Sequence, residues 1–440
     1  MQNAVSQLGQ YLAMLSLTMR QTLIAALQVP LVFSHPPATP GLLKTERTCV
    51  VQPSPQGSDS APAIIQAFSD CGHNDGPNRG KVVFQNDTYL VKSVMNTTGL
   101  RNVDVELHGT LLWDTDIQYW LNHSLPMGYQ NQSSAWLFGG EGLRWDGYGH
   151  GTLDGNGQVW YTYINGTNNY PRRPHQITFT GLKDSIIEGV RFVQSQMWTM
   201  TLIHSKNVLL ENIYVNNTDK NRGTDGADTI YADNITFRNW IVQNGDDSIS
   251  LKANSTNILI ENCQFYTGLG IAIGSIGQYN GVFETIQNVT ARNITIHDQM
   301  RYGAYVKTWT GNSTGYPPNG GGGGLGYATN ITLEDFKLNN PSGIFAITQC
   351  TSYNSATGGC DTSKFNIRDL KMVNWSGTAA SDVVAELQCS GASPCTGIVI
   401  EGIDIIDSMN GTRPANYLCD SVVDQTGFNC TGAPWGENNR

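Results

Sequence analysis

A degenerate seven-residue repeat constrains the fold of this chain more than any other feature of its sequence. Each copy reads polar, apolar, any residue, apolar, charged residue, turn residue, apolar. The copies begin at Asp184, Asn207, Asn234, Asn257, Asn288, Asn330 and Gly397. Apolar residues two positions apart make a strand with one buried face, and the Asn, Asp or Gly that follows tolerates the left-handed conformation of a tight turn. The repeat therefore predicts a strand and a turn at each of these places.

The spacing of the copies favours a stacked solenoid. Between residues 184 and 288 the copies start 23, 27, 23 and 31 residues apart. A unit of this length cannot bury its apolar face alone, so it stacks on the neighbouring coils. The sequence lacks the regular leucines of leucine-rich repeats and the long amphipathic helices of ankyrin or TPR arrays. We therefore expect an all-β fold, a single parallel β-helix of roughly ten coils over residues 45–430, with a helix at Pro62–Cys71 covering its N-terminal end.

The charge of the chain argues against nucleic-acid binding. Lys and Arg number 26 against 36 Asp and Glu, which leaves a net charge of −10 and a sequence pI of about 5.2. An acidic protein offers nothing to offset the repulsion of phosphate groups. Only 14% of the residues are charged, whereas Gly, Asn, Thr and Ser are abundant, as is typical of strands joined by many turns.

The N-terminus has the pattern of a targeting segment. Met19-Arg20 precedes a mostly apolar run, Thr22–Phe33, and a proline-containing breaker follows. This arrangement is typical of a secretory signal peptide, whereas the apolar run is too short and too interrupted for a transmembrane span. A buried N-terminal helix is the alternative. We expect a signal region at residues 1–40, with Met19 as an alternative start, and one β-helix domain at residues 41–440 that is secreted and does not bind membranes.

Glycosylation motifs support secretion. The sequence contains fifteen N-x-S/T sequons, and this number indicates a glycosylated surface, although Asn and Thr are common here and some matches arise by chance. The sequon asparagines are Asn86, Asn96, Asn122, Asn131, Asn165, Asn216, Asn234, Asn254, Asn288, Asn293, Asn312, Asn330, Asn374, Asn410 and Asn429. Asn429 directly precedes Cys430, and we expect it to be used poorly.

The nine cysteines agree with an oxidising compartment. Neighbours in the sequence suggest four disulfide bonds, although spacing alone cannot fix their connectivity. The suggested pairs are Cys49–Cys71, Cys350–Cys360, Cys389–Cys395 and Cys419–Cys430, which leaves Cys263 unpaired. The sequence has no Cys-x-x-Cys motif and no Cys/His cluster with the spacing of zinc ligands.

Three aspartates stand about one coil apart. Asp225 precedes Asp246 by 21 residues and Asp247 by 22, and matching positions of adjacent parallel strands lie about 4.7–4.9 Å apart. One coil would therefore bring three carboxylates together. Their mutual repulsion raises at least one pKa, so that a protonated acid and an ionised base coexist, as glycoside hydrolysis requires. The alternatives are ordinary turn residues, since Asp-Gly pairs are common in turns, and a calcium site.

The motifs around these aspartates resemble those of a known family. Thr224–Asp228 (Thr-Asp-Gly-Ala-Asp) and Gly245–Asp247 (Gly-Asp-Asp) are similar to the signature of glycoside hydrolase family 28, the polygalacturonase and rhamnogalacturonase family. Gly274–Gly277 resembles the downstream glycine-serine segment of that family. Asn254–Asn257 and Ser275–Tyr279 look most like the fungal exo-acting members.

This resemblance implies a fold, a reaction and residue roles. The implied fold is the right-handed parallel β-helix of pectin-lyase type. The implied reaction is single-displacement hydrolysis with inversion, in which Asp246 is the general acid and Asp225 and Asp247 activate water. The implied activity is exo-acting cleavage of pectin, best matched by galacturan 1,4-α-galacturonidase, with a pectic poly- or oligosaccharide as the substrate. No metal or organic cofactor is implied, and we expect a monomer.

Three departures from the family pattern bear on the substrate. Gly223 stands where the family has an Asn before Thr-Asp, Leu269 replaces the His of its Gly-His-Gly motif, and Tyr305 replaces the Arg of its Arg-Ile-Lys motif, of which Lys307 remains. In polygalacturonases that Arg and Lys are taken to bind the galacturonate carboxylate, and an Arg-to-Tyr change removes a charge and a bidentate donor. Rhamnose has a methyl group where galacturonate has the carboxylate. An exo-acting rhamnogalacturonan hydrolase, releasing rhamnose or galacturonate, is therefore the alternative.

Further residues are candidates for binding the sugar. They are Lys307, Tyr305, Asp228, Tyr279 and Lys252. A solvated lysine or an aromatic ring at the edge of the core is the simpler interpretation of such residues. Ser248 stands where the family usually has a cysteine, which agrees with an unpaired Cys263. Two other classes remain open: a calcium-dependent pectate lyase, and a non-catalytic pectin-binding β-helix, for which the lost His and Arg are the best argument.

Overall fold

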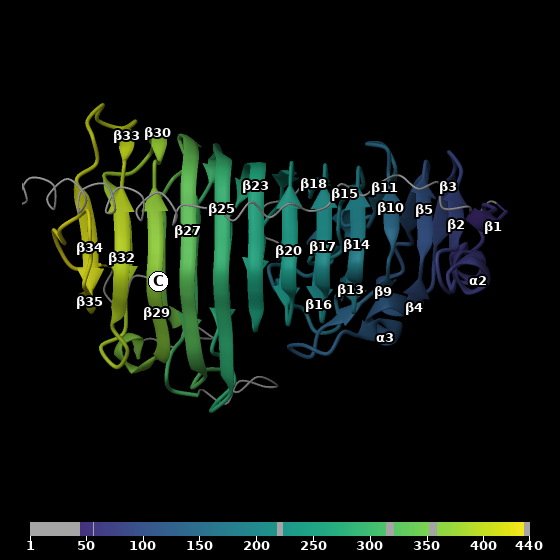
Figure 1. The fold of residues 1–440 in the computed structure, drawn as a ribbon, viewed down its shortest axis with the longest axis horizontal. Helices are drawn as coiled ribbons and strands as arrows, with labels where there is room; N and C mark the ends of the chain where they lie inside the picture. Colours follow the sequence, from purple (N-terminus) through teal and green to yellow (C-terminus); the bar gives the residue numbers. More distant parts are fainter. Residues whose placement is uncertain (1–44, 56, 218–222, 314–320, 352–358, 435–440) are drawn as a thin grey trace, which may run out of the picture. The chain divides into compact units, whose positions relative to one another are not determined.

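The computed structural model describes residues 45–55, 57–217, 223–313, 321–351 and 359–434. They belong to one compact unit, Lys44–Arg440, and the signal region expected at residues 1–40 lies outside the described residues. Parallel pairing joins each coil to the next throughout this unit (Figure 1). The fold is a right-handed parallel β-helix, which confirms the prediction from the repeat and the family resemblance. No helix in the described part is long and apolar enough to cross a membrane.

One ladder of parallel strands, here called the cleft sheet, runs from residue 95 to residue 420. Its strands are β4 (Met95–Arg101), β9 (Trp136–Glu141), β13 (Ile177–Thr180), β16 (Met200–Ile203), β19 (Ala227–Ile230), β22 (Asp247–Leu251), β24 (Gly270–Ile276), β26 (Ala304–Trp309), β28 (Phe345–Thr351), β31 (Val383–Gln388) and β34 (Asn416–Asp420). Every residue of β16, β19 and β22 is buried. Since a strand turns alternate side chains to opposite faces, the outer face of this sheet is covered as well as the inner one.

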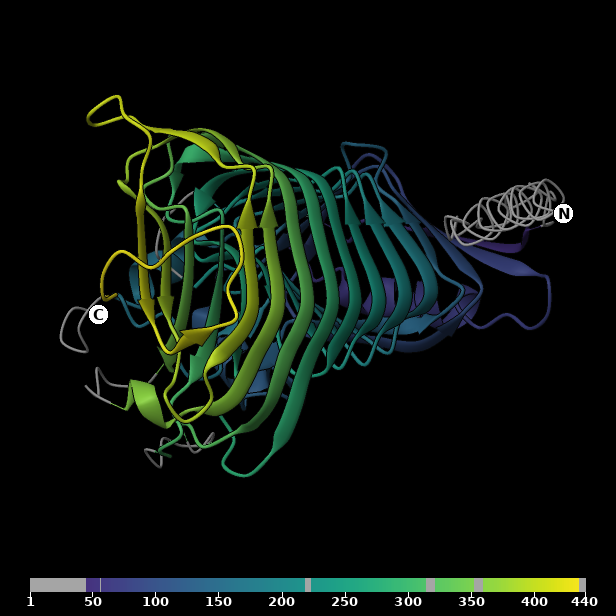
Figure 2. The same cartoon turned by 60° about the vertical axis from the view of Figure 1, so that its left-hand side comes forward.

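Every copy of the sequence repeat forms part of a second ladder, here called the repeat sheet, whose strands lie side by side in chain order (Figures 1 and 2). Its strands are β1 (Thr45–Val51), β2 (Arg79–Phe84), β5 (Val103–Leu107), β10 (Arg144–Asp146), β14 (Lys183–Glu188), β17 (Lys206–Glu211), β20 (Asp233–Arg238), β23 (Ser255–Gly268), β25 (Phe283–Met300), β27 (Leu325–Asn339), β29 (Lys364–Val373), β32 (Cys395–Glu401) and β35 (Val422–Val423). Apolar residues such as Ile235, Ile258 and Val289 pair in register and are buried.

A third ladder of shorter strands closes the coil. It comprises β3 (Thr88–Val91), β6 (Thr110–Trp113), β11 (Thr152–Asp154), β15 (Arg191–Val193), β18 (Tyr214–Asn216), β21 (Ile241–Gln243), β30 (Ser376–Ala379) and β33 (Asp404–Asp407). In the middle coils its place is taken by the second halves of β23, β25 and β27, which bend from one sheet into the next. The core fills the space between the three ladders. Its N-terminal coils are packed with rings such as Trp136, Phe138 and Trp145.

Asparagine and glycine shape the turns beside the repeat sheet. All predicted turn residues at the sixth position of the repeat have positive φ, namely Gly189, Asn212, Asn239, Asn262, Asn293, Asp335 and Gly402. The side-chain amides also link the coils, because Asn239 Nδ2 donates to Asn212 Oδ1 at 3.1 Å and Asn262 Nδ2 donates to Asn239 Oδ1 at 3.3 Å. The opening residue of each copy has positive φ too, which the sequence pattern did not reveal.

Helices and a small second sheet occupy the connections. Helix α2 (Ala61–Cys71) lies at the N-terminal end, where a helix was predicted, and packs on β1, β2 and β4. The other helices among the described residues are α3 (Ile117–His123), α4 (Gln158–Tyr163) and the 3₁₀ helix Cys360–Thr362. Strands β7 (Leu125–Pro126), β8 (Ser133–Ser134) and β12 (Pro174–His175) form the second sheet. These insertions bring chain segments from the N-terminal coils toward the outer face of the cleft sheet.

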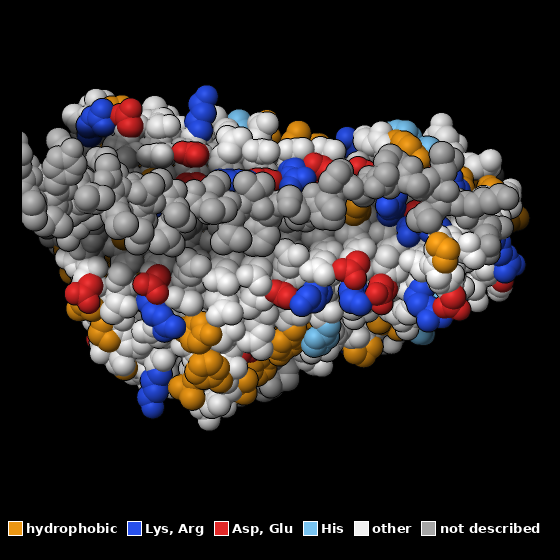
Figure 3. All heavy atoms as spheres, viewed as in Figure 1, with side chains coloured by type: hydrophobic (Ala, Val, Ile, Leu, Met, Phe, Trp, Pro, Cys, Tyr) orange, Lys and Arg blue, Asp and Glu red, His pale blue; other side chains and the backbone are white. Residues whose placement is uncertain are grey.

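Four disulfide bonds are present among the described residues. They are Cys49–Cys71, Cys350–Cys360, Cys389–Cys395 and Cys419–Cys430, the same neighbouring pairs that the sequence suggested. Cys263 is unpaired and buried. On the face of the molecule in Figure 3, uncharged side chains and backbone predominate, and acidic and basic side chains often lie next to one another. This surface agrees with the low charged fraction of the sequence.

Candidate active site

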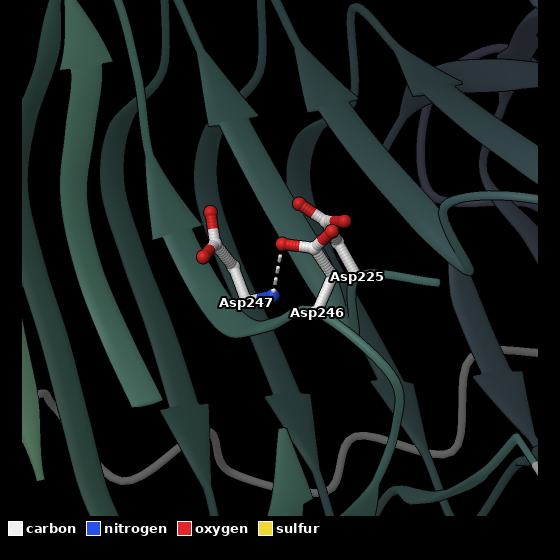
Figure 4. A group of neighbouring side chains, drawn as sticks. All are labelled: Asp225, Asp246 and Asp247. Atoms are coloured by element: carbon white, nitrogen blue, oxygen red, sulfur yellow. Dashed lines mark hydrogen bonds between the residues drawn. The ribbon is translucent and has the colours of Figure 1, made fainter. Parts of the chain in front are cut away.

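The three predicted aspartates meet on the outer face of the cleft sheet. Asp225 lies just before β19, Asp246 just before β22, and Asp247 is the first residue of β22. The two strands are adjacent, and the backbone N–H of Gly226 donates to the carbonyl of Asp247 at 2.9 Å. One oxygen from each of the three carboxylates lies within 4.8 Å of the others. Figure 4 shows the side chains of Asp225 and Asp246 close together, with Asp247 beside them.

A buried asparagine fixes the turn that carries Asp246. Asn244 Nδ2 donates to the carbonyl oxygens of Thr224, Asp246 and Asp247 at 3.0, 2.9 and 2.8 Å. The backbone N–H of Asp247 donates to Asp246 Oδ1 at 3.0 Å, the dashed line of Figure 4. Ser248, which stands where the family usually has a cysteine, donates to Asn244 Oδ1 at 3.3 Å. These bonds hold two neighbouring coils at a constant distance, so the carboxylates are preorganised for chemistry.

Two donors from strand β26 hold Asp247. Lys307 Nζ donates to Asp247 Oδ2 at 2.7 Å, and the hydroxyl of Tyr305 donates to Asp247 Oδ1. Lys307 Nζ also lies 3.2 Å from the Tyr305 hydroxyl. The carboxylate of Asp247 is 1% exposed, and a buried charge of this kind is tolerated only when it is paired and hydrogen-bonded.

The surroundings separate the pKa values of the three acids. Burial by itself would raise the pKa of Asp247, but the charges of Lys307 and Lys252 and the two hydrogen bonds hold it below its usual value. Burial and the neighbouring charge of Asp247 raise the pKa of Asp246 to about 6. Burial and three acidic neighbours raise the pKa of Asp225 well above its ordinary range. The cluster therefore contains an ionised carboxylate next to acids that keep their protons in mildly acidic solution.

A second buried pair lies directly beside the cluster. Lys252 Nζ lies 3.3 Å from Asp228 Oδ1 and 4.7 Å from the ring centre of Trp198. Burial raises the pKa of Asp228 to about 7, in opposition to the charge of Lys252, which lowers it. Asp228 is fully buried, whereas Lys252 reaches the surface of the pocket described next. Asp228 therefore holds Lys252 in place and does not itself face the substrate.

The aspartates open into a pocket with a volume of about 260 Å³, which is small beside the roughly 300–1,000 Å³ of sites for drug-sized ligands. Its lining consists of Gln130, Asn169, Trp198, Asp225, Asp246, Asp247, Lys252, Ser275, Lys307, Trp309 and Thr351. Gln130 comes from the loop between β7 and β8, and its side chain donates to Gln278 Oε1 at 2.7 Å. Segments from distant coils thus wall in the site on the side of the N-terminal insertions.

Of the five residues predicted to bind the sugar, Lys252 and Lys307 line the pocket. Tyr305, Asp228 and Tyr279 are not among the lining residues. Tyr305 and Asp228 hold Asp247 and Lys252, as described above, and the hydroxyl of Tyr279 accepts a hydrogen bond at 3.3 Å from the backbone N–H of Gln130. These three residues therefore support groups that face the pocket.

Several lining residues had no role in the sequence prediction. Gln130, Asn169, Trp198 and Thr351 stand outside the aspartate motifs, and nothing in their local sequence indicates that they reach the site. Leu269, which replaces the family's histidine, packs with Tyr302 against a small apolar cluster around Tyr305. Gly223, which replaces the family's asparagine, has a φ of +61°, a conformation that asparagine also tolerates.

The aspartate triad is the one group of described residues with a donor set suited to a metal ion. Calcium, however, prefers six to eight oxygen ligands, and the two oxygens of Asp247 already accept hydrogen bonds from Lys307 and Tyr305. The ammonium group of Lys307 supplies the positive charge that a cation would bring. The donor set therefore fits acid–base chemistry better than calcium binding.

A parallel β-helix with three convergent carboxylates in a walled pocket defines a class of polysaccharide-cleaving enzymes. Comparison with known sequences identifies the family. The profile described as Glycosyl hydrolases family 28 matches residues 83–426, and the chain belongs to this family. It is therefore classed with the glycoside hydrolases, and the family match favours hydrolysis over the two alternatives, a pectate lyase and a non-catalytic binding protein.

Several fungal hydrolases are similar to this chain. The chain is 50% identical to "Alpha-L-rhamnosidase rgxB" of Aspergillus niger, over 95% of this chain and 97% of that protein. It is 38% identical to "Putative galacturan 1,4-alpha-galacturonidase A" of Aspergillus niger, over 88% and 92%. The fold is similar to that of the endo-xylogalacturonan hydrolase from Aspergillus tubingensis, with a TM-score of 0.74 and 24% identity over 88% of this chain and 100% of that chain.

Proposed function

We propose that this protein is an exo-acting pectin hydrolase that releases terminal α-L-rhamnose from an acidic pectic oligosaccharide. The observation that carries the proposal is that both lysines of the pocket are already paired with aspartates, Lys307 with Asp247 and Lys252 with Asp228. A terminal galacturonate would need a cation for its carboxylate, whereas rhamnose presents a methyl group there. The 50% identical relative that is named an α-L-rhamnosidase supports the same sugar.

The remaining walls of the pocket suit a neutral sugar. Apart from the aspartates and lysines, the lining consists of uncharged polar side chains and the two indoles of Trp198 and Trp309. Aromatic faces pack on the apolar faces of sugars, and amides and hydroxyls bind their hydroxyl groups. The galacturonidase that the sequence resemblance favoured remains the second candidate, because the side chain of Lys307 is 19% exposed at the pocket surface.

The proposed mechanism uses the separated pKa values. Asp246, with a pKa of about 6, protonates the leaving oxygen. Asp247 stays ionised and takes the proton of the attacking water, which Asp225 helps to hold. These acids lie closer together than the roughly 6.5–9.5 Å typical of inverting glycosidases. The anomer formed first is therefore a sharp test of the inversion that the family resemblance implies.

The confined pocket supports exo action. Gln130 and Asn169 come from insertions in the N-terminal coils and line the same pocket as Lys307 and Trp309 of β26. A wall on one side leaves room for one terminal sugar and prevents a chain from passing through. We further infer secretion. The four disulfides support an oxidising compartment, and thirteen of the fifteen sequon asparagines are exposed while Asn216 and Asn254 are partly buried.

A release assay tests the proposal. The purified protein is incubated in EDTA with two oligosaccharides of equal length, a rhamnogalacturonan oligomer ending in rhamnose and an oligogalacturonate. The released sugar is identified by chromatography and mass, and its first anomer by proton NMR. We expect rhamnose from the first substrate and at least about 100-fold slower release from the second, since a site without a free partner leaves a buried carboxylate unpaired.

The controls separate the alternatives. Asp246→Asn protein prepared in the same way accounts for contaminating hydrolases. Galacturonate released rapidly from the homopolymer would replace rhamnosidase by galacturonidase. Fragments from the interior of a long chain would contradict exo action, and loss of activity in EDTA would contradict the metal-free mechanism.

A further inference from the structure

Tyr305 is placed to act on a catalytic group and not on the sugar. Its side chain is 7% exposed and lies outside the lining of the pocket. In register on either side stand Ala272 of β24 and Ala346 of β28, so small residues leave room for the ring. The ring of Tyr302 lies 5.5 Å away, centre to centre. The ring of Tyr305 thus packs among these side chains, and its hydroxyl group donates to Asp247 Oδ1.

Tyr305 and Lys307 act on Asp247 as a pair. They lie two positions apart on β26, so both side chains leave the same face of the strand. One donates to Oδ1 and the other to Oδ2 of the same carboxylate, which fixes both the position and the rotation of that group. Lys307 alone would leave the carboxylate free to rotate about its bonded oxygen.

We propose that Tyr305 is a positioning residue that holds Asp247 in the orientation required of the catalytic base. The phenol adds a hydrogen bond without adding a charge. A neutral phenol offsets the negative charge of Asp247 less than a second cation would. The Asp247 carboxylate therefore attracts the proton of the attacking water more strongly. This inference deepens the proposed function and rests on it, because its main readout is turnover.

The electrostatics of the site agree with this role. Burial raises the pKa of Tyr305 well above 10, and the charge of Asp247 raises it further, so the phenol stays a donor at every pH of interest. The charged or titratable groups around Asp247, besides Tyr305 itself, are Asp225, Asp228, Asp246, Lys252 and Lys307. Among the influences that lower the pKa of Asp247 is the hydrogen bond from Tyr305. Removing the hydroxyl therefore makes Asp247 easier to protonate.

The test compares Tyr305→Phe with Tyr302→Phe, a matched control that loses the neighbouring hydroxyl. For each protein, kcat and KM are measured against pH on the rhamnose-ending oligomer. For Tyr305→Phe we expect kcat to fall at least tenfold, KM to stay within about twofold, and the acidic limb of the pH profile to move up by about one unit. Tyr302→Phe should match the wild type. A raised KM with an unchanged pH profile would overturn the proposal in favour of substrate contact, and an unchanged kcat would overturn it outright.

A second readout needs no substrate and separates this inference from the proposed function. Because the folded pKa of Asp247 is lowered, its contribution to stability is present above its unfolded pKa and is lost as the pH falls through the folded value. Thermal unfolding of Tyr305→Phe should therefore show a larger loss at pH 6 than at pH 3. Equal losses at both pH values would mean that Tyr305 is only a packing residue. If the wild type releases neither sugar, the proposed function fails while this measurement still decides the role of Tyr305.

Discussion

The repeat sheet and the cleft sheet use one backbone arrangement for opposite purposes. On the repeat sheet, opposite charges follow one another along neighbouring coils, so that the buried Glu261 binds the more exposed Arg238 on one side and Arg292 on the other, each at 2.7 Å. On the cleft sheet, Asp225, Asp247 and other charges are buried side by side. A ladder spacing near 4.8 Å thus either pairs a charge with opposite charges on the neighbouring coils or brings several acids together in one patch.

The difference teaches where a solenoid can hold an active site. In the repeat sheet neighbouring coils share one residue pattern, and the turn asparagines from Asn212 to Asn293 are hydrogen-bonded from coil to coil. In the cleft sheet the outer face changes around the site, where Asp228, Ser250, Ala272 and Tyr305 follow one another in register on successive coils. Burying several acids together is unfavourable. The regular sheets on the other sides of each coil fix the backbone, and this fixed backbone keeps the acids together.

The largest expected effect comes from the cleft sheet. Asp246→Asn keeps the acceptor for the backbone N–H of Asp247 but has no proton to give to the leaving oxygen. We expect kcat to fall by about 100- to 10,000-fold, with an unchanged circular dichroism spectrum. The release assay measures this loss. Near-normal turnover by the folded variant would mean that Asp246 is not the general acid. The cleft sheet would then not differ from the repeat sheet through this residue.

A smaller effect concerns the pH dependence of the unfolding free energy that the raised pKa of Asp246 causes. Asp246 has a pKa of about 6 in the folded protein and about 3.9 in an unfolded chain, so the folded state binds more protons between these values. The contribution of Asp246 to stability should therefore fall as the pH rises from 4 to 6 and then level off. Calorimetry at several pH values should show that Asp246→Asn is spared about 2 kcal/mol of this fall. Parallel curves for the two proteins would contradict the raised pKa.

The smallest effect belongs to the repeat sheet. Asn239 is exposed, has a φ of +58° and bonds to Asn212 and Asn262. Asn239→Ala should cost about 1 kcal/mol of unfolding free energy, because alanine disfavours this conformation and cannot bond. Asn239→Gly, which accepts the conformation, should cost less. Chemical denaturation measures both, and kcat should stay at the wild-type value. A loss of activity would mean that the two sheets are coupled more closely than their separate ladders suggest.

The sequence predicted the regular part of the molecule because that information is local. Alternating apolar residues followed by Asn or Gly specify a strand and a turn within seven positions, and all seven copies lie in the repeat sheet. The distance along the chain between the motif Thr224–Asp228 and the pair Asp246-Asp247 can also be read directly from the sequence. One coil brings them together, as expected.

What the sequence by itself determined is therefore the coil, its turns and the cluster of three aspartates, since these depend on contacts between adjacent coils. Only the tertiary structure decided what surrounds that cluster. Gln130 and Trp309 are far apart in the chain yet line one pocket. Tyr305 donates a hydrogen bond to Asp247 and is not among the lining residues. Such contacts depend on where long insertions end and which atom a side chain reaches, and no local pattern of residues encodes either.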